Sequence, residues 1–205
     1  MEVKSIKGIY TCMTYYIQAK DGIIVFDASI DYETIQQASG NQKVLALLLT
    51  HGHFDHIFYT KEYNDQSVPV YIHEADSDCL YTDKNLGIHM GKKVAESKAD
   101  FFVQQGQTLQ ISDKKIKVIH TPGHTKGGVC YWVSDIMISG DTLFYHDYGR
   151  TDLIGGSEQE LTASVRKLLK TVDPKTTVYP GHGKSTTIEE EQKFFTQTIG
   201  AIDPQ

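Results

Sequence analysis

The chain has 205 residues, of which 40% are hydrophobic and 22% are charged, and it carries a net charge of −6. This composition is typical of a soluble globular domain and excludes a disordered or fibrous chain. No apolar run reaches the roughly 20 residues that cross a bilayer, and the start lacks the basic and apolar segments of a signal peptide. We therefore expect one cytoplasmic domain over residues 1–205 that binds no membrane. The acidic charge and the lack of a Lys/Arg run also argue against nucleic acid as a partner.

The three cysteines, Cys12, Cys79 and Cys130, are widely spaced and odd in number. They form no C-x-x-C pair, and their spacing suits no disulfide framework. Since a free cysteine behaves as a small hydrophobic residue, we expect buried, reduced thiols.

The hydrophobic pattern alternates between strand and helix periods along the chain. Val44–Leu49 is continuously apolar, which suits a strand covered on both faces, whereas Leu161, Val165 and Leu168 recur at helical spacing. This alternation predicts a layered α/β domain. In chain order, we predict strands over Ile9–Ile17 and Ile23–Phe26, a helix over Asp31–Ser39, strands over Val44–Leu49 and Val68–Ile72, a helix over Glu74–Tyr81, a surface loop with some helix over 82–100, strands over Ile116–His120, Val129–Val133 and Ile136–Ser139, a helix over Ser157–Thr171, a strand over Thr177–Tyr179 and a helix over Ile188–Ile199.

The segment after the strand Val44–Leu49 concentrates residues that bind metals. His51 and His53 are two residues apart, so at the end of a strand both imidazoles leave the same face. Asp55 and His56 are adjacent and begin the next element, from which they can reach a neighbouring point. One short loop can therefore supply half of the ligands of two metal ions.

Three more candidate ligands stand in similar places, at strand ends next to glycine turns. His124 follows Pro122-Gly123, Asp141 follows Gly140, and His182 follows Gly181. Glycine permits tight turns, and the preceding strand holds the ligand rigidly. Since ligands in open α/β sheets bind just beyond strand ends, we predict that all of these residues meet there. The predicted two-metal site consists of His51, His53, Asp55, His56, His124, Asp141 and His182.

These motifs resemble those of the metallo-β-lactamase superfamily, and within it the glyoxalase II-like thioesterases. Asp141 stands where the glyoxalase-like branch uses a bridging aspartate. The run from Ser139 to Phe144 and the segment Gly149-Arg150-Thr151-Asp152 resemble the short, single-domain hydroxyacylglutathione hydrolases and, nearly as much, the persulfide dioxygenases. The resemblance extends from about Tyr10 to Phe195. Two supporting turns depart from the family pattern, at Met13-Thr14-Tyr15 and Asp27-Ala28-Ser29.

The resemblance implies a four-layer αββα sandwich with metals at one edge. It implies that His51, His53 and His124 hold the first metal, that Asp55, His56 and His182 hold the second, and that Asp141 bridges them. Nitrogen and oxygen ligands suit two Zn²⁺ ions, although Fe or Mn would also accept them. A hydroxide shared by two such metals would attack an acyl thioester, such as S-D-lactoylglutathione, and Asp55 would orient it.

Four other residues are candidates for substrate contacts. Arg150 and Lys184 stand at the family's glutathione-contacting positions, although they differ from its usual residues, and Tyr145 and His146 stand where a pocket wall should be. An equally good interpretation of Arg150 is an ion pair with Asp152. The sequence does not reveal the acyl group, the thiol carrier or the oligomeric state.

The main alternative is an oxidoreductase, a persulfide dioxygenase with one Fe(II) held by two histidines and Asp141. A metal-binding domain without catalysis is a further alternative. β-Lactam or RNA cleavage also occurs in the superfamily, because fold does not fix substrate. Asp141 argues against the first of these substrates, and the acidic charge argues against the second.

Overall fold

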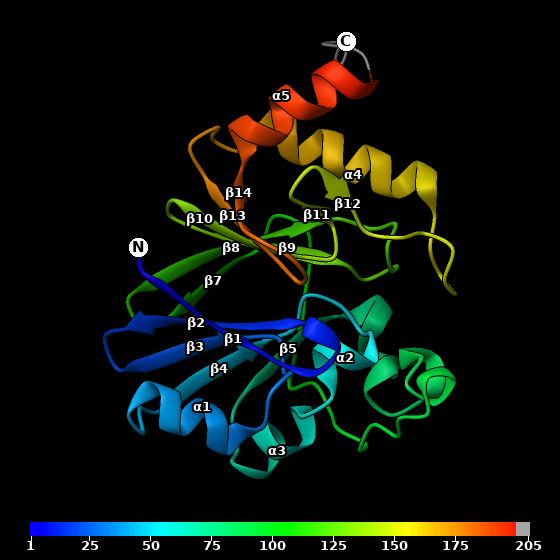
Figure 1. The fold of residues 1–205 in the computed structure, drawn as a ribbon. Coiled ribbons are helices and arrows are strands. Elements are labelled where there is room, and N and C mark those ends of the chain that lie inside the picture. The colour runs from blue at the N-terminus through cyan, green and yellow to red at the C-terminus, as the bar shows by residue number, and fades with distance from the viewer. Residues whose placement is uncertain (200–205) are drawn as a thin grey trace.

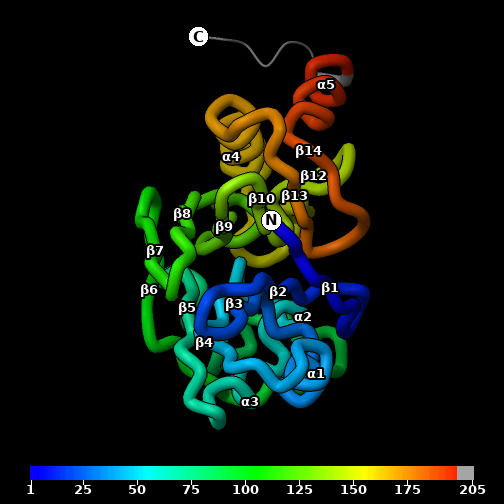
Figure 2. The backbone as a smooth tube through the Cα atoms, turned by 90° about the vertical axis from the view of Figure 1, so that its left-hand side faces the viewer, coloured from blue at the N-terminus to red at the C-terminus, as the bar shows by residue number. Residues whose placement is uncertain are grey.

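The structure, a computed structural model, describes residues 1–199, and in it two six-stranded sheets face each other (Figure 1). Helices cover the outer face of each sheet, so that Figure 2 shows four layers from α4 and α5 at one side to α1 and α3 at the other. This arrangement confirms the predicted αββα sandwich. No helix among residues 1–199 is long and apolar enough to cross a membrane.

The first sheet combines an antiparallel part with a parallel part. Strands β1 to β3 pair in antiparallel fashion, whereas β3, β4, β5 and β6 run parallel. Its strands, in sheet order, are β1 (Val3–Lys7), β2 (Met13–Ala19), β3 (Gly22–Phe26), β4 (Val44–Leu48), β5 (Val70–His73) and β6 (Phe101–Val103).

The second sheet is antiparallel except where β10 runs parallel to β13. A small ribbon, β11 (Leu143–Phe144) with β12 (Asp147–Tyr148), follows β10. The strands of the sheet, in order, are β14 (Thr186–Thr187), β13 (Thr177–Pro180), β10 (Ile136–Gly140), β9 (Val129–Val133), β8 (Lys114–His120) and β7 (Thr108–Ile111).

Three hydrophobic cores explain why the central strands are apolar throughout. One fills the space between the sheets, where the rings of Phe26 and Tyr131 lie 5.8 Å apart. The second lies between the first sheet and the helices below it, around Ile35 and Tyr63, and the third lies under α4 and α5. Burial on both faces leaves no polar alternation in these strands. The helices are α1 (Tyr32–Ser39), α2 (Phe54–Ile57), α3 (Thr60–Asp65), α4 (Glu158–Thr171) and α5 (Ile188–Ile199), with short 3-10 turns η1 (Ile9–Thr11), η2 (Glu74–Leu80), η3 (Asp83–Asn85) and η4 (Ile88–Met90).

Some predicted elements need correction. The strand predicted from Ile9 begins at Met13, because Tyr10 and Thr11 adopt positive φ values of 48° and 64° that break an extended chain. The helix predicted over Glu74–Tyr81 is the 3-10 segment η2. The sequence pattern did not predict β1, α2, α3, β6, β7, β11, β12 and β14. These are short elements with mixed exposure, and in β6 the side chains of both Phe101 and Phe102 are exposed.

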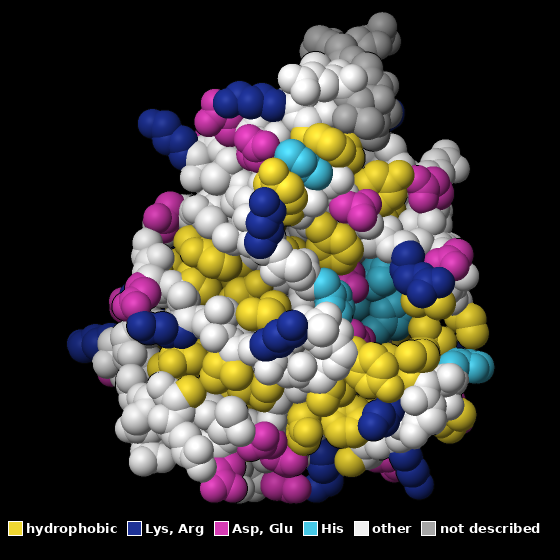
Figure 3. All heavy atoms as spheres, in the orientation of Figure 1, with side chains coloured by type: hydrophobic (Ala, Val, Ile, Leu, Met, Phe, Trp, Pro, Cys, Tyr) yellow, Lys and Arg dark blue, Asp and Glu magenta, His cyan; other side chains and the backbone are white. Residues whose placement is uncertain are grey.

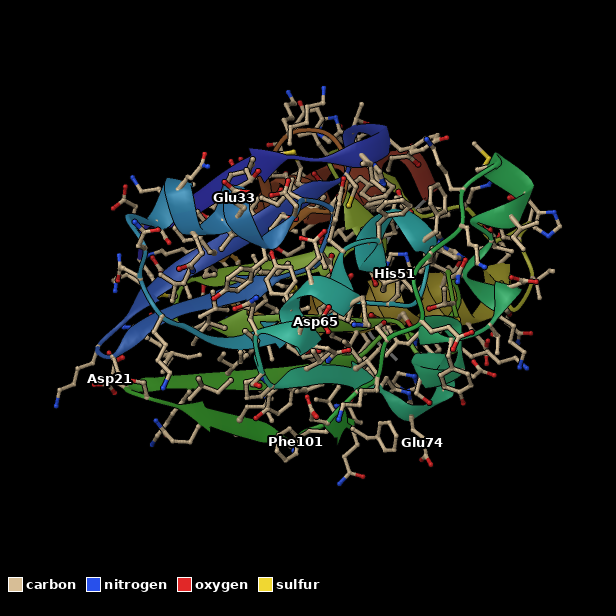
Figure 4. All side chains as sticks on the ribbon, turned by 90° about the horizontal axis from the view of Figure 1, so that it is seen from below. Asp21, Glu33, His51, Asp65, Glu74 and Phe101 are labelled. Atoms are coloured by element: carbon tan, nitrogen blue, oxygen red, sulfur yellow. The ribbon has the colours of Figure 1, made fainter. Side chains whose placement is uncertain are left out.

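One edge of the sandwich receives the loops that carry the predicted ligands. The loop after β4 is joined to the second sheet by the hydrogen bond from the Val129 amide to the Thr50 carbonyl, 2.9 Å long. The Gly181 amide donates in the same way to the Gly140 carbonyl, also at 2.9 Å. Figure 4 shows His51 toward the end of the sandwich opposite Asp21, which lies in the β2–β3 turn. Loops far apart in the sequence therefore meet at this edge.

Candidate metal centre

Three imidazoles from two loops form a first cluster of ligand atoms. Nε2 of His51 lies 3.2 Å from Nδ1 of His53, which lies 2.8 Å from Nε2 of His124. All three side chains are buried. Burial lowers the pKa of His51 well below its usual value, and burial together with repulsion from His124 lowers that of His53 to about 3. Neutral imidazoles with converging nitrogen atoms are suited to bind a divalent metal.

A second cluster lies beside the first. Ligand atoms of Asp55, His56 and His182 lie within 4.8 Å of one another, together with Sγ of Cys12. Asp55 and His56 belong to α2, so the helical turn directs both side chains to one point. An oxygen of Asp55 lies 3.2 Å from Nε2 of His182.

Asp141 lies between the two clusters. Its carboxylate oxygens are 3.4 Å from Nε2 of His56, 3.5 Å from Nε2 of His124 and 3.7 Å from Nε2 of His182. Burial opposes ionisation of Asp141, but the three histidines outweigh it and lower the pKa of this carboxyl group well below its usual range. Asp141 is therefore an anion in contact with both sets of nitrogen atoms.

Two atoms of these clusters show that the residues fit metal ions. Five buried side-chain atoms in the described part of the chain have no hydrogen-bond partner, and two of them, Nε2 of His56 and Oδ1 of Asp141, belong to these clusters. An unsatisfied buried polar atom costs about 1–3 kcal/mol, and metal coordination would remove this cost at both positions. The His/Asp cluster is therefore able to bind metal ions.

The imidazole nitrogen atoms of His56 and His124 that point away from the clusters are held by groups whose role the sequence did not reveal. Asp27 is 1% exposed, and its carboxylate accepts hydrogen bonds from Nδ1 of His56 at 2.8 Å and from the amide and hydroxyl of Thr50 at 2.7 and 2.9 Å. Nδ1 of His124 donates to the Arg150 carbonyl at 2.7 Å. Such partners fix the tautomer, so that the other nitrogen keeps its lone pair for the metal. Asp27 was seen only as part of a supporting turn, and no sequence signal marks its role.

Asp76, also buried, joins the two loops of the first cluster. It accepts hydrogen bonds from the amide of Gly52 at 3.0 Å, from the hydroxyl of Thr125 at 2.7 Å and from the amide of Gly127 at 2.7 Å. The loop of His51 and the loop of His124 are therefore held together by one carboxylate. This role too was not visible in the sequence.

A cavity of about 700 Å³ opens onto both clusters. Figure 3 shows histidine side chains at the bottom of a hollow with hydrophobic side chains around it. A substrate in this cavity would meet the ligands of both clusters at once. The predicted metal ligands in its lining are His53, Asp55, His124, Asp141 and His182, and the other wall residues include Tyr10, Phe54, Leu86, Met90, Phe144, Leu153 and Ile154.

The four predicted substrate contacts lie in two different places. Arg150 lines the cavity, but its Nε and one terminal nitrogen each lie 2.7 Å from an oxygen of Asp152, which is the ion pair that the sequence left as an alternative. Tyr145, His146 and Lys184 do not line this cavity.

Contacts elsewhere explain the placement of these three residues. His146 has a positive φ of 57°, which turns it toward α5, where its Nε2 lies 2.8 Å from Glu190. Tyr145 stacks on His146 at 3.9 Å, and Nζ of Lys184 lies 3.5 Å from the centre of the Tyr145 ring. The expectation that Tyr145 and His146 form the wall of this cavity is therefore corrected, and a substrate contact of Lys184 stays a prediction.

The sequence pattern and the fold both match one known family. The family model described as metallo-beta-lactamase superfamily matches residues 8–182. The chain belongs to the metallo-beta-lactamase superfamily. Among curated members, it is 36% identical over 186 residues to the probable metallo-hydrolase YqgX of Bacillus subtilis, which covers 87% of this chain and 88% of that protein.

Solved structures of the metallo-beta-lactamase fold agree with this assignment. The crystal structure of the B3 metallo-beta-lactamase BLEG-1 is 33% identical, with a TM-score of 0.88 over 94% of this chain and 97% of that one. TTHA1623, solved in a di-iron-bound form, is 28% identical, with a TM-score of 0.80 over 93% of this chain and 96% of that one. Together with the relatives named probable metallo-hydrolase, these similarities support a metal-dependent hydrolase.

Proposed function

We propose that this chain hydrolyses acyl thioesters at a two-metal centre formed by the seven predicted ligands. The observation that carries the proposal is the position of Asp141, which lies within 3.7 Å of histidines from both clusters while facing the cavity. Two divalent metals held by these residues, such as zinc or iron, would supply Lewis acidity and a hydroxide nucleophile at neutral pH. The same chemistry suits the carbonyl of a thioester, whose thiolate leaving group needs little protonation.

Asp55 is the residue that we assign to the nucleophile. It lines the cavity, and burial, which opposes its ionisation, is outweighed by His56 and His182, so that its pKa is lowered. An ionised carboxylate at this point accepts a hydrogen bond from the attacking water and orients it toward the substrate carbonyl. Oriented attack of this kind is worth several orders of magnitude in rate.

The cavity wall restricts the substrate further. Of the residues that line it, Arg150 is the one Lys or Arg side chain, and its guanidinium is already paired with Asp152. The remaining wall is largely apolar, with Phe54, Leu153 and Ile154 among its members. A thioester with an apolar acyl group and an uncharged thiol carrier therefore fits this cavity better than a thioester of glutathione, whose thiol carrier has two carboxylates.

Similarity to BLEG-1 favours a second candidate, β-lactam hydrolysis. BLEG-1 is described as a B3 metallo-beta-lactamase, and its structure and this one share a TM-score of 0.88 at 33% identity. A β-lactam carbonyl would occupy the same place between the clusters as a thioester carbonyl. A chromogenic cephalosporin therefore belongs in the same substrate panel.

The test combines metal content with turnover on one sample. Protein purified without added metal is analysed by mass spectrometry, and the same sample is assayed with S-D-lactoylglutathione, an acyl thioester of a small neutral thiol and a cephalosporin. About two metals per chain with thioester turnover is the expected result. About one iron, no thioester turnover and oxygen uptake with glutathione persulfide would instead identify a persulfide dioxygenase.

Two variants sharpen this assay. Asp55→Ala is expected to lower kcat/KM at least about 100-fold while the protein stays folded. Asp147→Ala is the matched control, because Asp147 also lines the cavity but belongs to neither cluster. Near-wild-type turnover in Asp55→Ala, or an equal loss in both variants, would contradict the role given to Asp55.

A further inference from the structure

A cysteine outside the seven predicted ligands faces the second cluster. Sγ of Cys12 lies within 4.8 Å of the ligand atoms of Asp55, His56 and His182. The residue is 0% exposed, and its thiol lies 3.9 Å from the Met13 carbonyl, which makes at most a weak hydrogen bond. We propose that Cys12 binds the second metal as a thiolate ligand, which rests on the metal centre of the proposed function.

The backbone before Cys12 directs its side chain inward. Tyr10 and Thr11 have φ values of 48° and 64°, a backbone conformation that residues other than glycine rarely adopt. The amide of Cys12 closes this turn by donating to the Ile9 carbonyl at 2.9 Å. As a result, Tyr10 lies on the cavity side against Phe54, with ring centres 5.0 Å apart, while Cys12 lies behind it in the interior.

The residue after Cys12 ties this turn to the loop of another ligand. The amide of Met13 donates to the carbonyl of Gly181 at 2.8 Å, and Gly181 directly precedes His182. The positions of Cys12 and His182 are therefore fixed relative to each other by the backbone. A rigid pair of this kind is what a metal site requires of its ligands.

A second observation points to a ligand at the same place. His56 is 0% exposed, and its Nε2, which faces this cluster, has no hydrogen-bond partner. With Cys12, the cluster offers one sulfur, two nitrogen atoms and one carboxylate, all of which are ligand types that Zn²⁺ binds. On binding, the thiol proton passes to solvent as the sulfur–metal bond forms. A soft thiolate favours zinc over manganese at this position.

The other two cysteines provide matched controls. Cys130 is buried in β9 and contacts the Thr121 hydroxyl and the Ser139 carbonyl, at 3.5 and 3.6 Å. Cys79 is buried against the loop at Gly52. Neither belongs to a group of possible metal ligands within residues 1–199. A spectroscopic signal from Cys12 can therefore be separated from a general effect of removing a buried thiol.

The first experiment loads the metal-depleted chain with Co²⁺ alone and records its absorption spectrum. The wild type is expected to show a near-ultraviolet thiolate-to-cobalt charge-transfer band. Cys12→Ser is expected to lose this band while keeping the visible bands of cobalt bound to histidine, and Cys130→Ser is expected to keep both. A wild type that binds two Co²⁺ without the band, or a band that survives in Cys12→Ser, would overturn the proposal.

X-ray absorption on the zinc-loaded wild type needs no variant, so it decides the question even if Cys12→Ser does not fold. The expected result is a sulfur scatterer at about 2.3 Å from zinc. Two zinc ions surrounded by nitrogen and oxygen alone would overturn the role of Cys12 and leave the proposed hydrolase intact. A chain that binds no metal would contradict the proposed function as well.

Discussion

Replacing Asp27 with asparagine tests how the second metal position is built. The carboxylate of Asp27 accepts a 2.8 Å hydrogen bond from Nδ1 of His56 and two more from Thr50. In Asp27→Asn, one oxygen can still accept from the Thr50 amide, but the new NH₂ group faces the imidazole. Nδ1 of His56 must then become an acceptor, and the ring proton moves to Nε2, the atom that faces the metal position.

The size of the effect follows from this change of tautomer. In a metal-binding histidine, the ring nitrogen that does not bind the metal usually donates a hydrogen bond. Loss of the acceptor of that bond lowers metal affinity about 10–100-fold, which corresponds to about 1.4–2.8 kcal/mol. The free energy of unfolding should also fall, by at least about 1.5–3 kcal/mol, because the oxygen that accepts from both Nδ1 of His56 and the Thr50 hydroxyl is replaced by an NH₂ group. The link from Asp27 to the first cluster is indirect, through the Thr50 hydroxyl, which lies 3.1 Å from Nδ1 of His51, so affinity there should fall less than at the second metal.

Competition with a chromophoric chelator measures the two metal affinities separately, and denaturant unfolding measures stability. Asp76→Asn is the matched control, because Asp76 is also a buried carboxylate with three hydrogen bonds but does not contact His56. It should lose stability and keep the second metal. If Asp27→Asn binds both metals with wild-type affinity, or if Asp76→Asn loses the second metal to the same degree, the reasoning is wrong.

Three further predictions concern the centre and the fold. A Cβ at Gly181 would lie 2.3 Å from Oδ1 of Asp141 and 2.6 Å from His56, so Gly181→Ala should displace both ligands and lower the metal content measured per chain. Asp31 caps α1 by accepting from the Thr34 amide at 2.8 Å, and Asp31→Ala should cost about 1 kcal/mol at pH 7 in denaturant unfolding. Burial opposes ionisation of Asp31, but Thr34 outweighs it and lowers the pKa, so this cost is present above the unfolded-state pKa and should vanish as the pH falls through the folded value. Removal of metal by a chelator should lower Tm, since a ligand at 100 times its Kd stabilises by about 2.7 kcal/mol, and added metal should restore it; an unchanged Tm in a chain shown to lose its metal would contradict this.

The fold could be predicted largely because its strands are buried on both faces. Val44–Leu48 is continuously apolar, and it lies between two cores, as such a run predicts. In α4, the residues at helical spacing, such as Leu161 and Leu168, are buried in the core between this helix and the second sheet. Short elements with mixed exposure, such as β6, have no comparable signal, because edge strands bury little of their surface.

The candidate ligands could be named from local sequence patterns. His51, His53, Asp55 and His56 are neighbours in the chain, so their spacing alone identifies a metal-binding loop. Strand ends next to glycine turns then identified His124, Asp141 and His182, which the structure brings to the same edge. Such patterns can be recognised in the sequence because the backbone geometry of a few residues sets the direction of their side chains.

The residues that surround those ligands could be found only from the packing of the folded chain. Cys12 and Asp27 lie more than 20 residues from the nearest predicted ligand, and only the packing of β2 and β3 against the loop after β4 brings them to His56. The positions of Tyr145 and His146 also depend on the tertiary structure. The positive φ of His146, at the turn of the small ribbon, directs its side chain toward α5, and Tyr145 stacks on it. Contacts between distant segments depend on the packing of the whole sandwich, and no pattern within a few residues of the chain contains that information.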